Sequence, residues 1–204
     1  MFDAELEKQK LQVPRIEKIE VTYKGKPEPY LLKMNKNIST PLDCTKHMVR
    51  TLTLRSALAM VDDEPWDMNR PLKDSCELKL LDFHAVILLC CAQTFWRSCS
   101  FLLGKVIDKA FKEDFPVSLL EQLASLPDTV TVYRLGDYCD LSPGPMITQT
   151  GLIGRIDTTA IHPVNTPKGL LYRFQGIAIP SQIGLQEAAY RLILKRARKL
   201  VSTP

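Results

Sequence analysis

The sequence predicts an α+β protein, and three of its features carry that prediction. Segments in which apolar and polar residues alternate, such as IEKIEVTY, predict half-buried strands. Segments in which apolar residues recur every three or four positions, such as FWRSCSFLLGKVIDKAF, predict amphipathic helices. The first third of the chain runs strand, strand, helix, strand, strand, which is typical of a compact α+β module of ubiquitin-like size.

The first module follows a charged segment, residues 1–15, which we expect to form a short helix or arm. IEKIEVTY and YLLKMN are its first two predicted strands, and KGKPEP is the turn between them. Thr40 is placed to cap a helix, with Pro41 at the first helical position and Asp43 at the third. Strands are expected again in SALAMVD and CELKL, with EPWDMNRP as a turn. We place this module at residues 16–83.

The second module is expected at residues 95–204, after a linker at residues 84–94. Its first helix has apolar residues at three- and four-residue spacings, at Cys99, Leu102, Leu103, Val106 and Ala110. VTVYRLGDYCDL and LLYRFQGIAIP are predicted strands, and LSPGPMI is a tight turn. A basic amphipathic helix is expected over residues 185–201. Its expected apolar side consists of Leu185, Ala189, Leu192, Ile193 and Leu200.

Composition excludes several classes of protein. With 45% apolar and 25% charged residues, the chain has the profile of a globular protein rather than a disordered one. Its longest apolar run, AVILLCCA, is far shorter than the roughly 20 residues of a membrane span. The N-terminus lacks the apolar stretch of a signal peptide. The six cysteines form no CxxC pair and have no histidine at zinc-ligand spacing, so we expect no metal, no cofactor and a reducing compartment.

Positive charge is concentrated near the C-terminus. The whole chain carries a formal net charge of +4, yet one segment, residues 168–204, is more basic than that total. Five of its basic residues fall on or beside one face of the expected helix: Arg191, Lys195, Arg196, Arg198 and Lys199. Such a face is typical of phosphate contacts with nucleic acid. A solvated helix face, or one that meets an acidic protein, is the open alternative.

Two stretches resemble parts of threonyl-tRNA synthetase. NISTPLDCTKHM through SCELKLLDF resembles its TGS domain, a β-grasp module, and the second module resembles its editing domain. In that enzyme a helix close to RHSCAHLLGHAI and a turn close to DMCRGPH supply three histidines and a cysteine, which remove serine from threonine tRNA. In WRSCSFLLGKVI and DLSPGPM the matching positions are Arg97, Phe101, Ser142 and Met146.

The resemblance therefore implies an editing domain that has lost its chemistry. Arginine is no general base at neutral pH, and phenylalanine and methionine have no titratable group. The surrounding frame is kept at Ser98, Cys99, Leu102, Leu103, Gly104, Gly144 and Pro145. We expect no catalytic residue and no small-molecule substrate, and a truncated, degenerate editing-like domain of α/β two-layer type. KEDFPVSLL runs almost directly into EQLASLPDTVTV, so a segment of the family pattern is missing near residues 120–121.

Further strings are similar to a family of mitochondrial large-subunit ribosomal proteins, the noncatalytic homologue of threonyl-tRNA synthetase numbered thirty-nine. They are MNKNISTP, PWDMNRPL, FWRSCSFLLG, RLGDYCDLSPGP and YRFQGIAIP. This similarity implies a structural protein in the mitochondrial matrix, with the ribosomal RNA and proteins of the large subunit as partners. A freestanding aminoacyl-tRNA editing deacylase is the alternative. A regulatory TGS adaptor is a third possibility, although no GxxxxGK[ST] loop is present for a GTPase.

Overall fold

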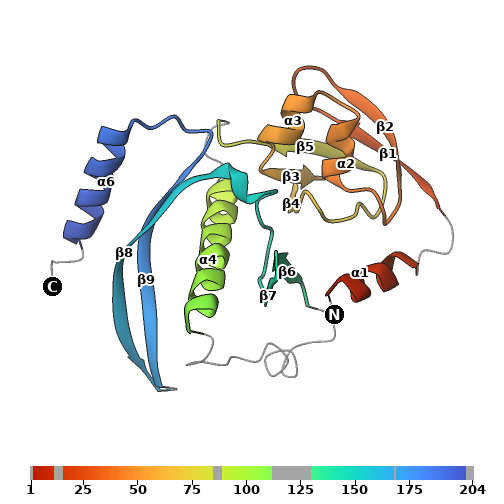
Figure 1. Cartoon of the computed structure of the whole chain (residues 1–204). Coiled ribbons are helices and arrows are strands. Elements are labelled where there is room, and N and C mark those ends of the chain that lie inside the picture. The colour runs from red at the N-terminus through yellow and green to blue at the C-terminus, as the bar shows by residue number, and fades with distance from the viewer. Residues whose placement is uncertain (1, 12–15, 85–88, 112–129, 168, 201–204) are drawn as a thin grey trace. The chain divides into compact units, whose positions relative to one another are not determined.

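The computed structural model describes residues 2–11, 16–84, 89–111, 130–167 and 169–200. The chain divides into two compact units, residues 1–149 and residues 150–204, and each is described by itself. Both units combine helices with antiparallel strand pairs, which confirms the predicted α+β class (Figure 1). The break expected near residues 120–121 lies outside the described residues.

The first unit contains eleven described helices and strands. They are α1 (Phe2–Leu11), β1 (Lys18–Tyr23), β2 (Tyr30–Asn35), α2 (Pro41–Lys46), α3 (Arg50–Arg55), β3 (Leu58–Val61), β4 (Glu64–Trp66), β5 (Cys76–Leu81), α4 (Leu89–Phe111), β6 (Val132–Leu135) and β7 (Tyr138–Leu141). The second unit contains a short 3-10 helix (Thr150–Leu152), β8 (Ile153–Thr166), β9 (Gly169–Pro180) and α6 (Glu187–Leu200).

Five strands of the first unit form one sheet in the order β2-β1-β5-β3-β4. Its central pair, β1 and β5, is parallel, and the other pairs are antiparallel. We call residues 18–81 the sheet module. The expected turn EPWDMNRP is partly wrong, because Glu64–Trp66 pairs with β3. Asp62 and Asp63 both have positive φ, so the hairpin turns within two residues and leaves the next three free to pair.

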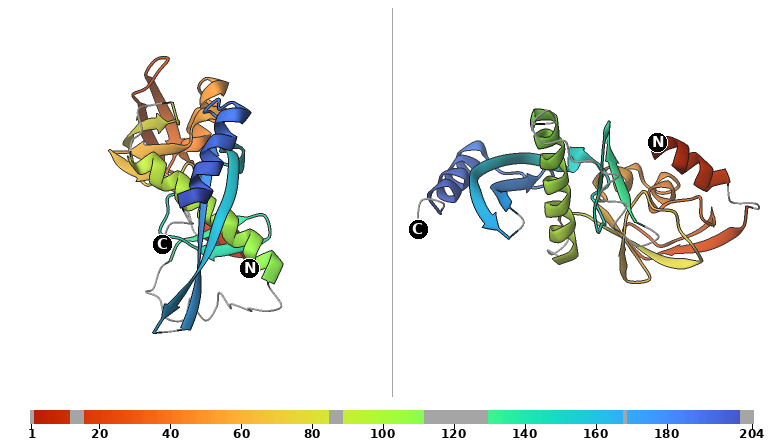
Figure 2. Two further views of the ribbon diagram at one scale, coloured as in Figure 1. Left: turned by 90° about the vertical axis from the view of Figure 1, so that its left-hand side faces the viewer. Right: turned by 90° about the horizontal axis from the view of Figure 1, so that it is seen from below.

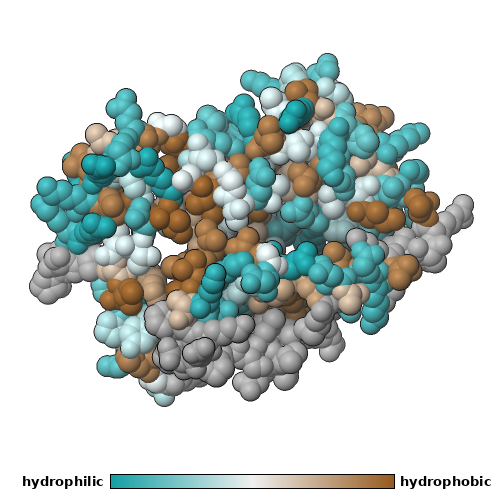
Figure 3. All heavy atoms as spheres, viewed as in Figure 1, coloured by the Kyte–Doolittle hydropathy of each residue, from teal (hydrophilic) through white to brown (hydrophobic). Residues whose placement is uncertain are grey.

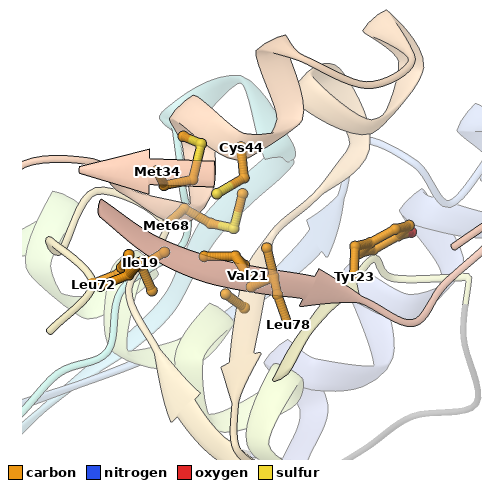
Figure 4. Packing of buried hydrophobic residues seen from close by; sticks show 9 residues of the cluster. Ile19, Val21, Tyr23, Met34, Cys44, Met68, Leu72 and Leu78 are labelled. Carbon is orange, nitrogen blue, oxygen red and sulfur yellow. The ribbon is translucent and has the colours of Figure 1, made fainter. Parts of the chain in front are cut away.

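The core of the sheet module lies between its sheet and the helices α2 and α3 (Figure 4). Alternation in β1 directs Ile19, Val21 and Tyr23 inward, as the sequence indicated. They meet Met34, Cys44, Ala59, Met68, Leu72 and Leu78. Every member of this cluster is nearly or fully buried. Since burial of one such side chain stabilises a fold by roughly 1.5–3 kcal/mol, the sheet module has a core of its own.

Helix α2 begins where the sequence predicted. The Thr40 side chain accepts a hydrogen bond from the Asp43 backbone amide, and the Asp43 carboxylate accepts one from the Thr40 amide at 3.1 Å. Pro41 is the first helical residue, where no amide hydrogen is needed. The short α3, which the sequence analysis did not predict, has no side-chain cap and no buried residue. The six residues of α3 therefore carry no capping or burial pattern from which a helix could be predicted.

Helix α4 starts earlier than predicted. It already includes Leu89, so the expected linker at residues 84–94 is wrong over its last part, and residues 85–88 of the apolar run lie outside the described residues. The apolar periodicity continues N-terminally through buried Cys91 and Phe95. Phe95 packs edge-on against Phe83, which lies two residues after the sheet module, with ring centroids 5.3 Å apart. This contact ties the helix to the module before it.

The second unit is built on an antiparallel ribbon of two strands. β8 and β9 pair along their whole length with two irregularities in register, and the ribbon curves strongly (Figure 2). β9 was predicted, whereas β8 was not. The sequence of β8, IGRIDTTAIHPVNT, does not alternate regularly between apolar and polar residues. The strand has a bulge between Thr158 and Ala160 and contains Pro163. Helix α6 packs against this ribbon through Tyr190.

Candidate functional site

Helix α4 places Arg97 and Phe101 one turn apart, on the side that faces the turn after β7. The Arg97 guanidinium donates a hydrogen bond from Nη1 to the carbonyl oxygen of Pro145, at 2.8 Å. The Arg97 side chain is half-buried, and this bond attaches it to the backbone of the turn. A guanidinium in this place holds the turn but cannot accept a proton, because arginine stays charged at any ordinary pH.

Phe101 is packed between two tyrosines of the β6–β7 hairpin. Its ring lies edge-on to Tyr133 and Tyr138, with centroid separations of 6.4 and 5.2 Å. Edge-to-face pairs at these distances are favourable beyond the area they bury. The position that the resemblance matches to an editing histidine is therefore the centre of an aromatic cluster.

The turn itself carries the other two positions. The Ser142 hydroxyl accepts a long hydrogen bond, 3.4 Å, from the Gly144 amide within the turn. The Met146 sulfur lies 3.5 Å from the hydroxyl of Ser98 on α4. The structure thus brings all four predicted positions to one place, where α4 meets the turn. Each of them makes a contact within the protein.

Asp67 also belongs to this place, although no sequence pattern predicted it. It follows β4 in the sheet module, and its carboxylate accepts hydrogen bonds from the Tyr133 hydroxyl at 2.8 Å and the Met146 amide at 2.7 Å. The only trace in the sequence was the PWDMNRPL string, which carried a family resemblance without a role. Contacts between residues that are 66 and 79 positions apart leave no local pattern.

Two glycines allow the tyrosines to approach. Gly144 has a φ of +56°, and a side chain there would overlap the Tyr133 hydroxyl. Gly104 on α4 faces Tyr138, whose hydroxyl oxygen would lie 3.2 Å from an added Cβ. The glycines therefore serve close packing of the aromatic cluster rather than access for a substrate.

The electrostatics of the site oppose nucleophilic chemistry. Burial, together with the charge and hydrogen bond of Asp67, raises the pKa of Tyr133 well above its usual range. Burial also raises the pKa of the Cys99 thiol to about 11. Because only a thiolate is an effective nucleophile, Cys99 is inert near neutral pH. Among the described residues no three histidine, cysteine or acidic side chains gather where they could hold a metal ion.

The predicted basic helix is present as α6, but its buried side differs from the expected one. Tyr190 is 4% exposed, whereas Leu192 and Ile193 are 50% and 38% exposed. Tyr190, Leu194 and Ala197 form the stripe that turns inward; the side chain of Leu200 lies outside the described residues. Tyr190 donates a hydrogen bond to Asp157 of β8, which explains why a tyrosine can be buried there.

All five basic residues of α6 are exposed. Arg191 is already bound within the chain, because its Nε donates a hydrogen bond to the carboxylate of Glu187 at 2.8 Å. Arg155 of β8 binds the same carboxylate and lies over the Tyr190 ring. A shallow surface depression on this helix is lined by Arg191, Leu194, Lys195, Arg198 and Lys199. The face is therefore a basic surface, and its Arg191 is bound to Glu187.

Among the described helices none is both long and apolar enough to cross a membrane. No family model matches the chain. The large ribosomal subunit protein mL39 of Drosophila melanogaster is 33% identical to it, over 98% of this chain and 82% of that protein. The alignment extends over 274 positions, whereas the chain has 204 residues, so the relative contains segments with no counterpart here.

Threonine–tRNA ligases are more distant relatives. The mitochondrial threonine–tRNA ligase 1 of Arabidopsis thaliana is 24% identical over 79% of this chain. A probable cytoplasmic threonine–tRNA ligase 1 of Dictyostelium discoideum is 32% identical over 37% of it. The chain spans 32% of the first ligase and 10% of the second. It is similar to a part of these ligases and to most of the length of the ribosomal protein.

Proposed function

The chain belongs to the family of the large ribosomal subunit protein mL39, and from this membership we propose that it is a structural component of the large subunit of the mitochondrial ribosome. The observation that carries the proposal is the 33% identity, because it extends over nearly all of the chain and 82% of the relative. Its partners are ribosomal RNA and neighbouring ribosomal proteins, and it resides in the mitochondrial matrix. We also propose that residues 16–83 are a TGS-like β-grasp module and residues 95–204 a degenerate editing-like domain. These bounds follow the resemblance and differ from the compact units, which divide after residue 149.

The direct test is sedimentation. A tagged full-length chain, expressed in cells, is followed through a gradient of mitochondrial ribosomes. We expect it to travel with the large subunit in a fixed ratio to other large-subunit proteins, and to stay there after the small subunit is removed. Recovery only in the light fractions with free tRNA would instead favour the editing deacylase.

The chain is noncatalytic in this proposal. Support comes from the four positions of the degenerate editing site, Arg97, Phe101, Ser142 and Met146, which offer no general base and no thiol. When purified protein is incubated with threonine tRNA that carries serine, the seryl ester should be hydrolysed only at its spontaneous rate. Turnover above that rate, lost on Tyr133→Phe or Arg97→Ala, would contradict a purely structural role.

The basic face of α6 is proposed to contact ribosomal RNA. Its five residues, Arg191, Lys195, Arg196, Arg198 and Lys199, are all exposed on one helix. Phosphate contacts of lysine and arginine position a protein without reading sequence, and they weaken as salt rises because counterions are released. Glu187 already neutralises part of the charge of Arg191, which reduces what this residue contributes.

Replacing these five residues by glutamine keeps helix propensity and removes the charge. We expect this variant to leave the large subunit at lower salt than the wild type. A matched control replaces five exposed lysines of the first unit, namely Lys18, Lys26, Lys33, Lys73 and Lys109. Equal release profiles for the α6 variant and the wild type would show that α6 instead meets a protein or solvent.

A further inference from the structure

The segment Pro145–Thr148 of the degenerate turn is bound from two sides. On one side it meets α4: Arg97 donates to the Pro145 carbonyl oxygen, and the Ile147 amide donates to the Ser98 hydroxyl at 2.9 Å. Ser98 is itself buried and bound to the helix carbonyl of Thr94. The attachment to α4 is therefore made at alternate residues of the segment, Pro145 and Ile147, and the Ser98 hydroxyl that takes part in it is buried.

On the other side the same segment meets the sheet module. The Met146 amide donates to the Asp67 carboxylate, as described above. The next but one residue, Thr148, donates from its amide to the Ala57 carbonyl oxygen at 3.1 Å. Its hydroxyl lies 2.6 Å from the Ser56 carbonyl oxygen, beside β3. Residues that are close in sequence thus bind alternately to the helix and to the sheet module.

Asp67 connects this segment to the aromatic cluster as well. One carboxylate oxygen holds the Met146 amide and the other holds the Tyr133 hydroxyl. Tyr133 in turn packs on Phe101, the residue in place of an editing histidine. The carboxylate therefore links the sheet module to two separate parts of the degenerate editing site.

From these contacts we infer that the degenerate editing site is a joint inside the chain, in which Asp67, Tyr133 and the segment Pro145–Thr148 fix the sheet module to α4 and the β6–β7 hairpin. Modules that meet through small polar contacts move relative to one another unless something holds them. A carboxylate that bridges two donors supplies directional bonds, which fix orientation as well as distance. In this inference the site fixes the orientation of the sheet module relative to α4 and the hairpin and carries out no reaction. These contacts lie within the chain, whichever partner it binds.

The test uses the full chain and a pair of matched variants. Tyr133→Phe removes one hydroxyl, keeps the ring on Phe101 and leaves the Met146 amide bound to Asp67. Tyr138→Phe is the control, because Tyr138 also packs on Phe101 but its hydroxyl binds Asp140 within the same hairpin. Asp67→Ala removes both hydrogen bonds of the carboxylate, the one to Tyr133 and the one to Met146. Amide-resolved hydrogen exchange by NMR is measured at Thr148 and, for reference, at residues of β1.

Thr148 is the informative amide, because its bond crosses to the sheet module and its partner is Ala57 rather than Asp67 or Tyr133. In Tyr133→Phe its exchange should be faster by about tenfold, the factor for one charge-assisted hydrogen bond, while β1 keeps the wild-type rate. Asp67→Ala should raise it further, and Tyr138→Phe should leave it unchanged.

Two outcomes would overturn the inference. Wild-type exchange at Thr148 in both Tyr133→Phe and Asp67→Ala would show that the contacts do not hold the two parts together. Equal acceleration at Thr148 and in β1 would show that Asp67 and Tyr133 stabilise the fold in general and form no joint.

Discussion

The sheet module and the β8–β9 ribbon differ in how far their apolar side chains are exposed. In the sheet module Val21, Leu58 and Leu78 are 0% exposed, because helices cover one face of a five-stranded sheet. In the ribbon, Ile161, Leu170 and Tyr172 are each more than half exposed, although they lie on the same face of paired strands. Figure 3 shows hydrophobic side chains at the surface on the face in view.

This difference follows from the number of strands. A ribbon of two strands is only marginally stable by itself, and its faces are too narrow to bury large side chains. The family relative also has segments with no counterpart in this chain. Monomeric proteins rarely leave such faces uncovered, so we expect the assembly to cover them. Four changes would break or sharpen this comparison.

The largest effect is expected in the core of the sheet module. Leu78→Ala leaves a cavity at a fully buried position and should lower the free energy of unfolding by about 2–5 kcal/mol. Ile161→Ala, which removes an exposed side chain of the ribbon, should change it by no more than about 0.5 kcal/mol. Urea denaturation followed by fluorescence measures both. Similar losses for the two variants would mean that the ribbon is as well packed as the sheet module.

Alkaline pH should weaken the first unit through Tyr133. Its folded pKa is raised above the usual value of about 10, so its contribution is complete below pH 10 and is lost as pH rises further. Each pH unit above 10 can remove up to about 1.4 kcal/mol per tyrosine until the folded pKa is reached. Urea midpoints between pH 8 and 11 should therefore fall less steeply for Tyr133→Phe than for the wild type. Parallel pH profiles would contradict this origin.

Much of the fold could be predicted because it depends on local patterns. The alternation around Val21 gave β1, and the sequence Thr40, Pro41, Asp43 gave the start of α2, since both signals span a few residues. β8 was missed because a bulge and Pro163 interrupt its period. The inward side of α6 was wrong because Tyr190, with a bonded hydroxyl, replaced the expected leucine and isoleucine.

The site could be predicted only as far as a resemblance carried it. The positions Arg97, Phe101, Ser142 and Met146 came from two motifs, and the fold places both motifs together. Asp67 could not be found in the same way, because it joins the site from a different module through bonds that span 66 and 79 residues. Such contacts depend on the relative orientation of two modules, which no window along the sequence contains.

A smaller effect is expected at the start of α2. Thr40→Ala removes the side chain that accepts from the Asp43 amide and should lower the free energy of unfolding by about 1 kcal/mol. Partial burial raises the pKa of Asp43, but hydrogen bonds from Lys46 and Thr40 outweigh it and hold the pKa below its usual range. Thr51→Ala, at an exposed position of α3, is the control. A loss no greater than that of the control would show that the capping box contributes nothing to stability.

The smallest change in stability is expected for the exposed face of the ribbon, where a different property should change. The triple variant Ile161→Thr, Leu170→Thr, Tyr172→Thr removes three exposed apolar side chains and keeps residues that favour strands. Its unfolding free energy should stay within about 0.5 kcal/mol per substitution of the wild type.

The purified wild-type chain should bind a dye specific for apolar surface, and the triple variant should lose most of that binding. The matched control replaces three exposed apolar residues of the sheet module, Leu31 of β2 and Val49 and Leu54 at α3. It should leave dye binding unchanged, because single exposed apolar residues are normal while a contiguous face is not. No dye binding by the wild type would show that the ribbon face is already covered within the isolated chain.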